Sequence, residues 1–122
     1  MPLEPRISIV DDDESVRRAT ESLLRLLGYA TESFASAEAF LAAGDVGRFA
    51  CVIADIKMPG MSGIDLSRLL GERKPKVPVI LITAFMEDSL RARTLGCGAA
   101  CVLAKPFSAE RLSASLAAAL VS

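Results

Sequence analysis

The sequence predicts an α/β fold, a doubly wound parallel sheet of five strands with helices on both faces. Five short apolar runs alternate with longer segments in which apolar residues recur at helical spacing. The run VILI, residues 79–82, is apolar at consecutive positions, as expected for a strand whose two faces are both covered by helices. A βα unit repeated five times satisfies both observations.

The expected strands are RISIV at 6–10, YATESF at 29–34, CVIA at 51–54, VPVILIT at 77–83 and ACVLA at 100–104. The first helix places its apolar residues from Val16 to Leu27 on one face. Gly28 follows it, where a left-handed residue is favoured, so the helix is expected to stop there. A short second helix over 37–43 takes Ser36 as its N-cap.

The remaining helices also have recognisable ends. Ser62 and Asp65 form a weak variant of the capping box at the start of the third helix. The fourth helix is expected around Leu90 to Leu95, before Gly96, and the fifth begins after Ser108. Each break between elements therefore has a chemical cause.

Length and charge limit what the chain does. A chain of 122 residues with 52% hydrophobic content fits one compact domain, which we expect to span residues 1–122. A formal net charge of −1, with both signs mixed along the chain, argues against direct nucleic-acid binding and against an anionic membrane surface. No apolar run approaches the roughly 20 residues of a membrane span, and MPLEPR lacks the apolar core of a signal peptide, so we expect a cytoplasmic location.

Cysteine and histidine usage limits the chemistry. The three cysteines, Cys51, Cys97 and Cys101, are odd in number and form no C-x-x-C pair, so we interpret them as reduced core thiols. The chain has no histidine, which excludes His-ligated metal and every mechanism that needs an imidazole base. Any chemistry here must use Asp, Lys, Thr and the backbone.

Polar side chains follow four of the five expected strands. The first strand ends in Asp11, Asp12 and Asp13, the third in Asp55, the fourth in Thr83, and Lys105 follows the fifth. In doubly wound sheets, ligands bind at the carboxyl ends of the strands, so these side chains are expected to meet. Gathered carboxylates repel one another unless a cation neutralises them, and hard oxygen ligands indicate Mg²⁺. A carboxylate nucleophile, a divalent cation, a lysine and a threonine are the groups needed to transfer a phosphoryl group to Asp.

Each of these residues also has a simpler interpretation. Asp13 is expected to cap the first helix. Asp11 and Asp12 are alternatively loop acids, although two acids directly after a buried strand are costly without a partner. Lys105 alone suits a solvated strand end, and Thr83 alone suits a β-strand. The coincidence of all four strand ends is what favours a functional site.

From Arg6 to Val121 the chain resembles the receiver domain of two-component response regulators. The motifs that carry the resemblance are VDDDE at 10–14, DIKMPGMSG at 55–63, ITA at 82–84 and KPF at 105–107. The middle and last motifs look most like the receivers of FixJ/NarL-type and NtrC-type transcriptional regulators. The resemblance implies the strand order 2-1-3-4-5.

The resemblance also implies roles for the strand-end residues. Asp55 would accept the phosphoryl group, Asp12 would bind Mg²⁺ directly, and Asp11 would bind it mainly through water. The main-chain carbonyl of Lys57 would complete the protein's share of the metal ligands. Lys105 would pair with the phosphoryl group, and Thr83 would move to donate a hydrogen bond to it. Such a domain signals by a population shift and catalyses only its own phosphorylation and dephosphorylation.

Three further positions matter within this resemblance. The family usually places Tyr or Phe three residues before the lysine, and here that position is Val102, so Thr83 is expected to move without displacing an aromatic ring. Lys57 and Phe85 flank the path of water to the acyl phosphate and are expected to slow its hydrolysis. The bond between Lys105 and Pro106 is expected to be cis.

Three other functions fit the sequence less well. DDDES at 11–15 loosely matches the nucleophile loop of haloacid-dehalogenase-type phosphatases, but that family needs an acidic pair after the lysine, and only Glu110 is acidic there. A flavodoxin-like flavin binder needs a hydroxyl- and glycine-rich phosphate loop where this chain has acids. A non-phosphorylated adapter receiver would not need the intact acids, Thr83 and Lys105.

The resemblance implies a sensor histidine kinase as partner, and allows a phosphorylation-dependent homodimer. An output or DNA-binding domain is expected if the chain is part of a longer regulator.

Overall fold

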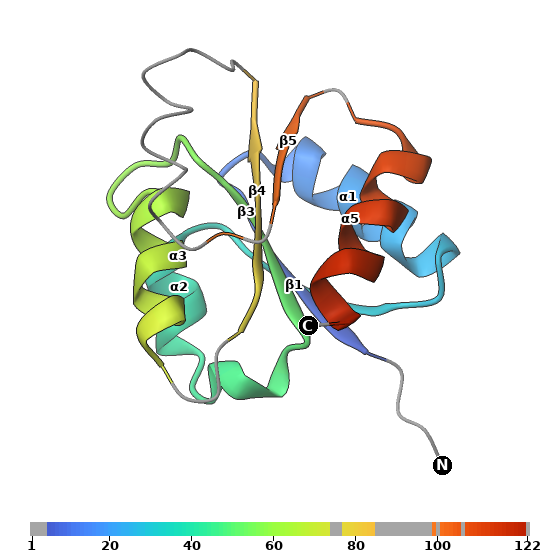
Figure 1. The fold of residues 1–122 in the computed structure, drawn as a ribbon. Helices are drawn as coiled ribbons and strands as arrows, with labels where there is room; N and C mark the ends of the chain where they lie inside the picture. Colours follow the sequence, from blue (N-terminus) through green and yellow to red (C-terminus); the bar gives the residue numbers. More distant parts are fainter. Residues whose placement is uncertain (1–4, 74–76, 85–98, 100, 106, 122) are drawn as a thin grey trace.

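The computed structural model describes residues 5–73, 77–84, 99, 101–105 and 107–121 (Figure 1). Its elements in chain order are β1 (Arg6–Val10), α1 (Glu14–Leu26), β2 (Ala30–Phe34), α2 (Ala37–Ala42), η1 (Val46–Arg48), β3 (Cys51–Asp55), α3 (Gly63–Glu72), β4 (Val79–Thr83), β5 (Cys101–Ala104) and α5 (Ala109–Val121). The five predicted strands are therefore present. The predicted fourth helix, Leu90 to Leu95, lies outside the described residues.

The five strands form one parallel sheet in the order β2-β1-β3-β4-β5. Both the fold class and the strand order are as predicted. From β1 the chain continues to β2 on one side of the sheet, and from β3 it continues to β4 and β5 on the other side. In a sheet of this kind, the carboxyl ends of those two strands border the place where ligands bind.

Helices cover both faces of the sheet, with α1 and α5 on one side and α2 and α3 on the other (Figure 1). Side chains alternate between the two faces along each strand, so neighbours in sequence enter different cores. The core beneath α1 and α5 includes Ile7, Ile9, Cys51, Ile53, Ile80, Ile82, Leu112 and Leu116. The core beneath α2 and α3 includes Val10, Phe40, Val52, Ala54, Ile64, Leu66, Leu70 and Leu81. Burial on both faces explains why the central strands are apolar throughout.

The predicted helix ends are confirmed. Gly28 has φ 96° directly after α1, a backbone conformation that favours glycine. Ala39 N donates to Ser36 Oγ at 3.0 Å at the start of α2. Ser62 and Asp65 form a complete reciprocal capping box at the start of α3. These contacts fix where the loops begin.

The 3₁₀ turn η1 was not predicted, because three residues are too few to show a periodicity. Val46 and Phe49 are buried on either side of it. Phe49 belongs to a cluster with Phe34 and Phe40. The ring centroids of Phe34 and Phe40 lie 5.4 Å apart in an edge-to-face arrangement. The turn therefore closes the end of the core beneath α2.

Cys51 is a free, fully buried thiol, and burial raises its pKa to about 12, as expected for an inert core cysteine. Cys101 is free and half-buried, while Cys97 lies outside the described residues. Among the residues described, no helix combines the length and the apolar character needed to cross a membrane.

Candidate functional site

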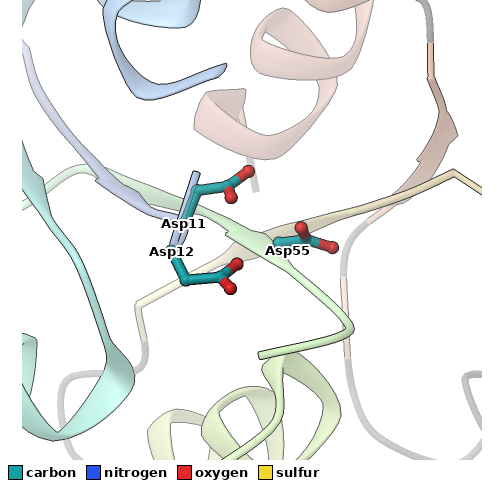
Figure 2. A group of neighbouring side chains, drawn as sticks. All are labelled: Asp11, Asp12 and Asp55. Atoms are coloured by element: carbon teal, nitrogen blue, oxygen red, sulfur yellow. The ribbon is translucent and has the colours of Figure 1, made fainter. Parts of the chain in front are cut away.

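Three carboxylates meet at the carboxyl ends of β1 and β3. One oxygen from each of Asp11, Asp12 and Asp55 lies within 4.8 Å of the others (Figure 2). Asp11 is fully buried and Asp55 nearly so, whereas Asp12 is exposed. The structure thus brings together three of the four acids that the sequence predicted to meet, and one of the three is open to solvent.

Asp55 is held at the end of β3 by backbone contacts on both sides. The peptide that follows it continues the sheet, since Ile56 N donates to Ile82 O at 2.9 Å. Lys57 N donates to Asp55 Oδ1 at 3.2 Å. Gly63 packs so closely behind the site that a Cβ there would overlap the carbonyl oxygen of Asp55. The carboxylate is therefore fixed by the chain before and after it.

The loop that carries Asp11 and Asp12 is equally ordered. Asp11 N donates to Phe34 O at 3.1 Å, and Asp13 N donates to Asp11 Oδ1 at 2.9 Å. Asp13 caps α1 through hydrogen bonds from Ser15 N and Val16 N, so the prediction that Asp13 is a cap is confirmed. Asp13 acts on the helix, which leaves Asp11 and Asp12 to face Asp55.

Lys105 supplies positive charge to this acidic cluster. Its Nζ lies 3.1 Å from Asp55 Oδ2 and 3.4 Å from Asp11 Oδ2. Its backbone N donates to Thr83 O at 2.8 Å, so β4 positions the start of the loop after β5. The sequence placed Lys105 at this edge, and the structure adds that it bridges two of the acids.

Burial and charge oppose each other in this site. Burial raises the pKa of Asp11 above its usual value, and the charge of Asp55 adds to that effect, while hydrogen bonds from Asp13 and Lys105 only partly offset it. The pKa of Lys105 is also raised: burial lowers it, but the hydrogen bond to Asp55 and the charges of both acids outweigh burial. An additional cation would relieve the repulsion that remains among the carboxylates.

Thr83 and Val102 lie on one face of the sheet. Leu81 is paired with Val102 across β4 and β5, and Thr83 follows Leu81 by two residues. Thr83 is buried, and Val102 packs partly buried against the core beneath α2 and α3. The position where an aromatic residue was expected is therefore next to the threonine strand and filled by a smaller side chain.

Lys57 has an exposed side chain and follows Asp55 by two residues. The predicted role of its carbonyl as a metal ligand stays a prediction. Phe85 and Pro106 lie outside the described residues, so the expected water barrier and the expected cis peptide stay predictions as well.

One contact near the site was not predicted. Met61 N donates to Glu38 Oε2 at 2.8 Å, which ties α2 to the loop between β3 and α3. The hydrogen bond lowers the pKa of Glu38. The two residues are 23 positions apart and both belong to exposed segments, so neither spacing nor hydrophobicity indicated the link.

An apolar groove of about 440 Å³ lies beside Lys105. Its lining residues are Val16, Ala19, Thr20, Leu23, Lys105 and Phe107. Four of these residues belong to α1, and Lys105 is the lysine that contacts Asp55. A partner bound in it would therefore lie next to the acidic cluster.

Comparisons with known proteins agree with this geometry. The chain is 40% identical over 119 residues to the response regulator protein TmoT of Ectopseudomonas mendocina, covering 96% of this chain and 53% of TmoT. It is 38% identical over 101 residues to the transcriptional regulatory protein FixJ of Rhizobium meliloti, covering 83% of this chain and 50% of FixJ. The chain thus spans about half the length of these curated relatives.

Among solved structures, the BeF3-activated DrrB receiver domain matches with a TM-score of 0.87 at 28% identity, over 98% of this chain and 100% of that one. A family model described as the response regulator receiver domain matches residues 7–117. On this evidence the chain belongs to the receiver domain family of two-component response regulators.

Proposed function

We propose that Asp55 accepts a phosphoryl group from a phosphohistidine of a sensor histidine kinase, with Mg²⁺ bound by the neighbouring acids. The observation that carries this proposal is the position of Lys105, whose Nζ lies 3.1 Å from Asp55 Oδ2 at the edge of a cluster of three carboxylates. Phosphoryl transfer to a carboxylate requires charge neutralisation and positioning, and these residues supply both.

The donor set fits a small hard cation. Oxygen atoms of Asp11, Asp12 and Asp55 converge within 4.8 Å, and Mg²⁺ favours carboxylate, carbonyl and water oxygens. Asp12, with its exposed side chain, would bind directly, Asp11 mainly through water, and the Lys57 carbonyl would complete the protein ligands. When bound, the cation would neutralise charge on the acids and on the transferred phosphoryl oxygens.

The chain's own residues account for the remaining chemistry. An oxygen of Asp55 attacks phosphorus, the P–N bond to the kinase histidine breaks, and an acyl phosphate forms on Asp55. Lys105 then exchanges its contact with the carboxylate for one with a phosphoryl oxygen. The hydroxyl of Thr83 donates a hydrogen bond to another phosphoryl oxygen. The donor histidine retains the electron pair of the broken P–N bond. The domain thus modifies only itself.

We further propose that residues 1–122 act as one receiver domain in the cytoplasm and control an output domain or a partner, with transcription as the regulated process. Support comes from the names of relatives such as FixJ, described as a transcriptional regulatory protein. Because a kinase must bring its phosphohistidine to Asp55, the apolar groove beside Lys105 is a suitable place for it to bind. A phosphorylation-dependent homodimer is a further part of this proposal.

The test is intact-mass measurement after treatment with acetyl phosphate, with MgCl₂ or with EDTA. We expect the mass of one phosphoryl group only with MgCl₂, and no gain for Asp55→Asn. An equal gain in Asp55→Asn would overturn the assignment of Asp55. No gain in the unsubstituted chain, from acetyl phosphate or from a phosphorylated kinase, would instead indicate a non-phosphorylated adapter.

We also propose that Lys57 and Phe85 prolong the phosphorylated state. The exposed side chain of Lys57, two residues after Asp55, would contact a phosphoryl oxygen and stabilise the acyl phosphate. Phe85 would offer no hydrogen bond to an attacking water. We expect faster loss of phosphate in Lys57→Asn and in Phe85→Glu, followed by intact mass after the phosphodonor is removed. Equal rates of phosphate loss in the unsubstituted chain and in both variants would contradict both roles.

A further inference from the structure

The backbone between β1 and α1 carries two of the three clustered acids. Asp11 and Asp12 lie between the two elements, where the β1–β2 ladder has reached its end. Asp11 N donates to Phe34 O, and Arg17 N donates to Asp13 O as the first hydrogen bond of α1. The carbonyl of Asp11 lies between these two anchors. It therefore needs a different partner if the loop is to be fixed.

Arg17 provides that partner. Its guanidinium NH1 donates to Asp11 O at 2.7 Å, a short charge-assisted hydrogen bond between partly buried groups. Side chains on a helix point back toward its N-terminus, so a residue in the first turns of α1 is well placed to reach the preceding loop. The contact connects the helix to the loop across six residues.

The accepting oxygen belongs to the peptide that joins Asp11 to Asp12. A peptide is planar, so fixing its oxygen also fixes the nitrogen of Asp12 and limits the direction of the Asp12 side chain. This matters most for Asp12, because the part of the chain described here contains no ion pair to its exposed carboxylate, whereas Lys105 contacts both Asp11 and Asp55. The direction of the Asp12 carboxylate thus depends on the backbone that carries it.

We propose that Arg17 is a positioning residue for the metal site, which holds the Asp11–Asp12 peptide so that the Asp12 carboxylate faces Asp11 and Asp55. This inference rests on the proposed function, because it requires that the three acids bind a divalent cation. Groups that orient metal ligands commonly change metal affinity by about 10- to 100-fold when they are removed. Arg17 would act in this way through a carbonyl and would not touch the cation.

Arg18 offers a matched control on the same helix. Its only described ion pair is with Glu14, and both side chains are largely exposed, at 78% and 64%. Arg17→Met and Arg18→Met remove the same charge from adjacent positions and keep a long side chain. A difference between the two variants therefore reports the contact with Asp11 more than net charge.

The experiment is a titration with MgCl₂ followed by backbone amide NMR shifts, together with urea unfolding in EDTA. We expect Arg17→Met to bind Mg²⁺ roughly tenfold more weakly than Arg18→Met. Arg17→Lys, which can still donate to the carbonyl, is expected to recover part of the affinity. A purely structural role would lower stability in EDTA while leaving the Mg²⁺ affinity of Arg17→Met equal to that of Arg18→Met, and this result would overturn the inference.

Two outcomes separate this inference from the proposed function. If the unsubstituted chain binds no Mg²⁺, the proposed metal site fails and the role of Arg17 fails with it. If the chain binds Mg²⁺ and both methionine variants bind it equally, only the role of Arg17 is wrong. Should Arg17→Met not fold, Arg17→Leu against Arg18→Leu makes the same comparison, because leucine also removes the guanidinium donors and the charge at each position.

Discussion

Lys105 Nζ lies 3.1 Å from Asp55 Oδ2, although the two residues are 50 positions apart in the sequence. The same ammonium group lies 3.4 Å from Asp11 Oδ2 and so links the ends of β1 and β3. In the proposed reaction this cation would first neutralise the acceptor and later the phosphoryl group. Lys105 is thus expected to favour phosphorylation but to weaken metal binding, because its ammonium group competes with the metal ion for the same acids.

Replacing Lys105 by Met should therefore separate metal binding from phosphorylation. We expect Mg²⁺ to bind several-fold more tightly, since the acids lose their internal counter-charge. Phosphorylation by acetyl phosphate should slow by roughly 100-fold, since a donor to the phosphoryl oxygens is lost. Arg111→Met, an exposed position on α5, is the control for net charge. Weaker Mg²⁺ binding in Lys105→Met would show that the lysine does not compete with the cation.

Asp11→Asn should stabilise the metal-free chain at neutral pH. Asp11 has a pKa raised above its usual 3.8, so the folded state holds this proton more tightly than the unfolded state does. The resulting penalty is fully present above the raised pKa and disappears as pH falls through it toward 3.8. The advantage of Asp11→Asn, measured by urea unfolding in EDTA, should accordingly shrink as the pH is lowered.

With MgCl₂ added, the unsubstituted protein should become more stable than Asp11→Asn, because a cation that binds only the folded chain stabilises the protein with the intact site more. An advantage of Asp11→Asn that is independent of pH would show that the charge of Asp11 is not its cause.

Two glycines of α3 should respond oppositely to alanine. A Cβ on Gly63 would lie 2.9 Å from the carbonyl carbon of Asp55 and 3.1 Å from Ile56 Cα, and backbone atoms cannot move aside easily. We expect Gly63→Ala to lower the free energy of unfolding by about 2 kcal/mol. A Cβ on Gly71 would meet nothing within 4 Å, so Gly71→Ala should raise stability by up to about 1 kcal/mol.

Urea unfolding measures both glycine variants, and phosphorylation by acetyl phosphate should fall only for Gly63→Ala, because Asp55 must shift. Equal stability of the two variants would show that α3 moves freely relative to β3.

The hydrogen bond from Met61 N to Glu38 should make the loop after Asp55 sensitive to acid. The Met61 hydrogen bond and the backbone of Glu38 itself lower the pKa of this carboxylate below its usual 4.5. Its contribution to stability is therefore present above pH 4.5 and is lost as pH falls through the lowered pKa.

We expect the hydrogen-exchange protection of the Met61 amide to fall in that acidic range, and to fall at neutral pH in Glu38→Gln and further in Glu38→Ala. Glu14→Gln, which affects only an exposed pair with Arg18, is the control. Unchanged protection in Glu38→Ala would show that another group holds the loop.

The fold was predictable because the central strands are short and apolar throughout, and because Gly28, Ser36 and Ser62 mark helix ends by local chemistry. These signals depend on neighbours in the sequence. The convergence of Asp11, Asp12, Asp55 and Lys105 was predictable for a related reason, since parallel strands bring their carboxyl ends to one edge.

The contacts that refine the site were not predictable. The hydrogen bonds from Arg17 to the Asp11 carbonyl and from Met61 to Glu38 each join a side chain to a backbone group whose position depends on how a loop turns. Likewise, the close packing of Gly63 on Asp55 depends on the angle at which α3 meets β3. The spacing of residues in the sequence does not determine such angles.

Asp11 and Asp12 follow the first strand and Asp55 ends the third, while Lys105 follows the fifth strand of the domain. During synthesis, a ribosome would release Asp11, Asp12 and Asp55 long before the lysine that neutralises them. The cluster of acids therefore lacks its lysine until nearly the whole domain has emerged and β5 has joined the sheet. A truncated or half-folded chain should then be unable to receive a signal, so that competence for signalling itself reports complete folding.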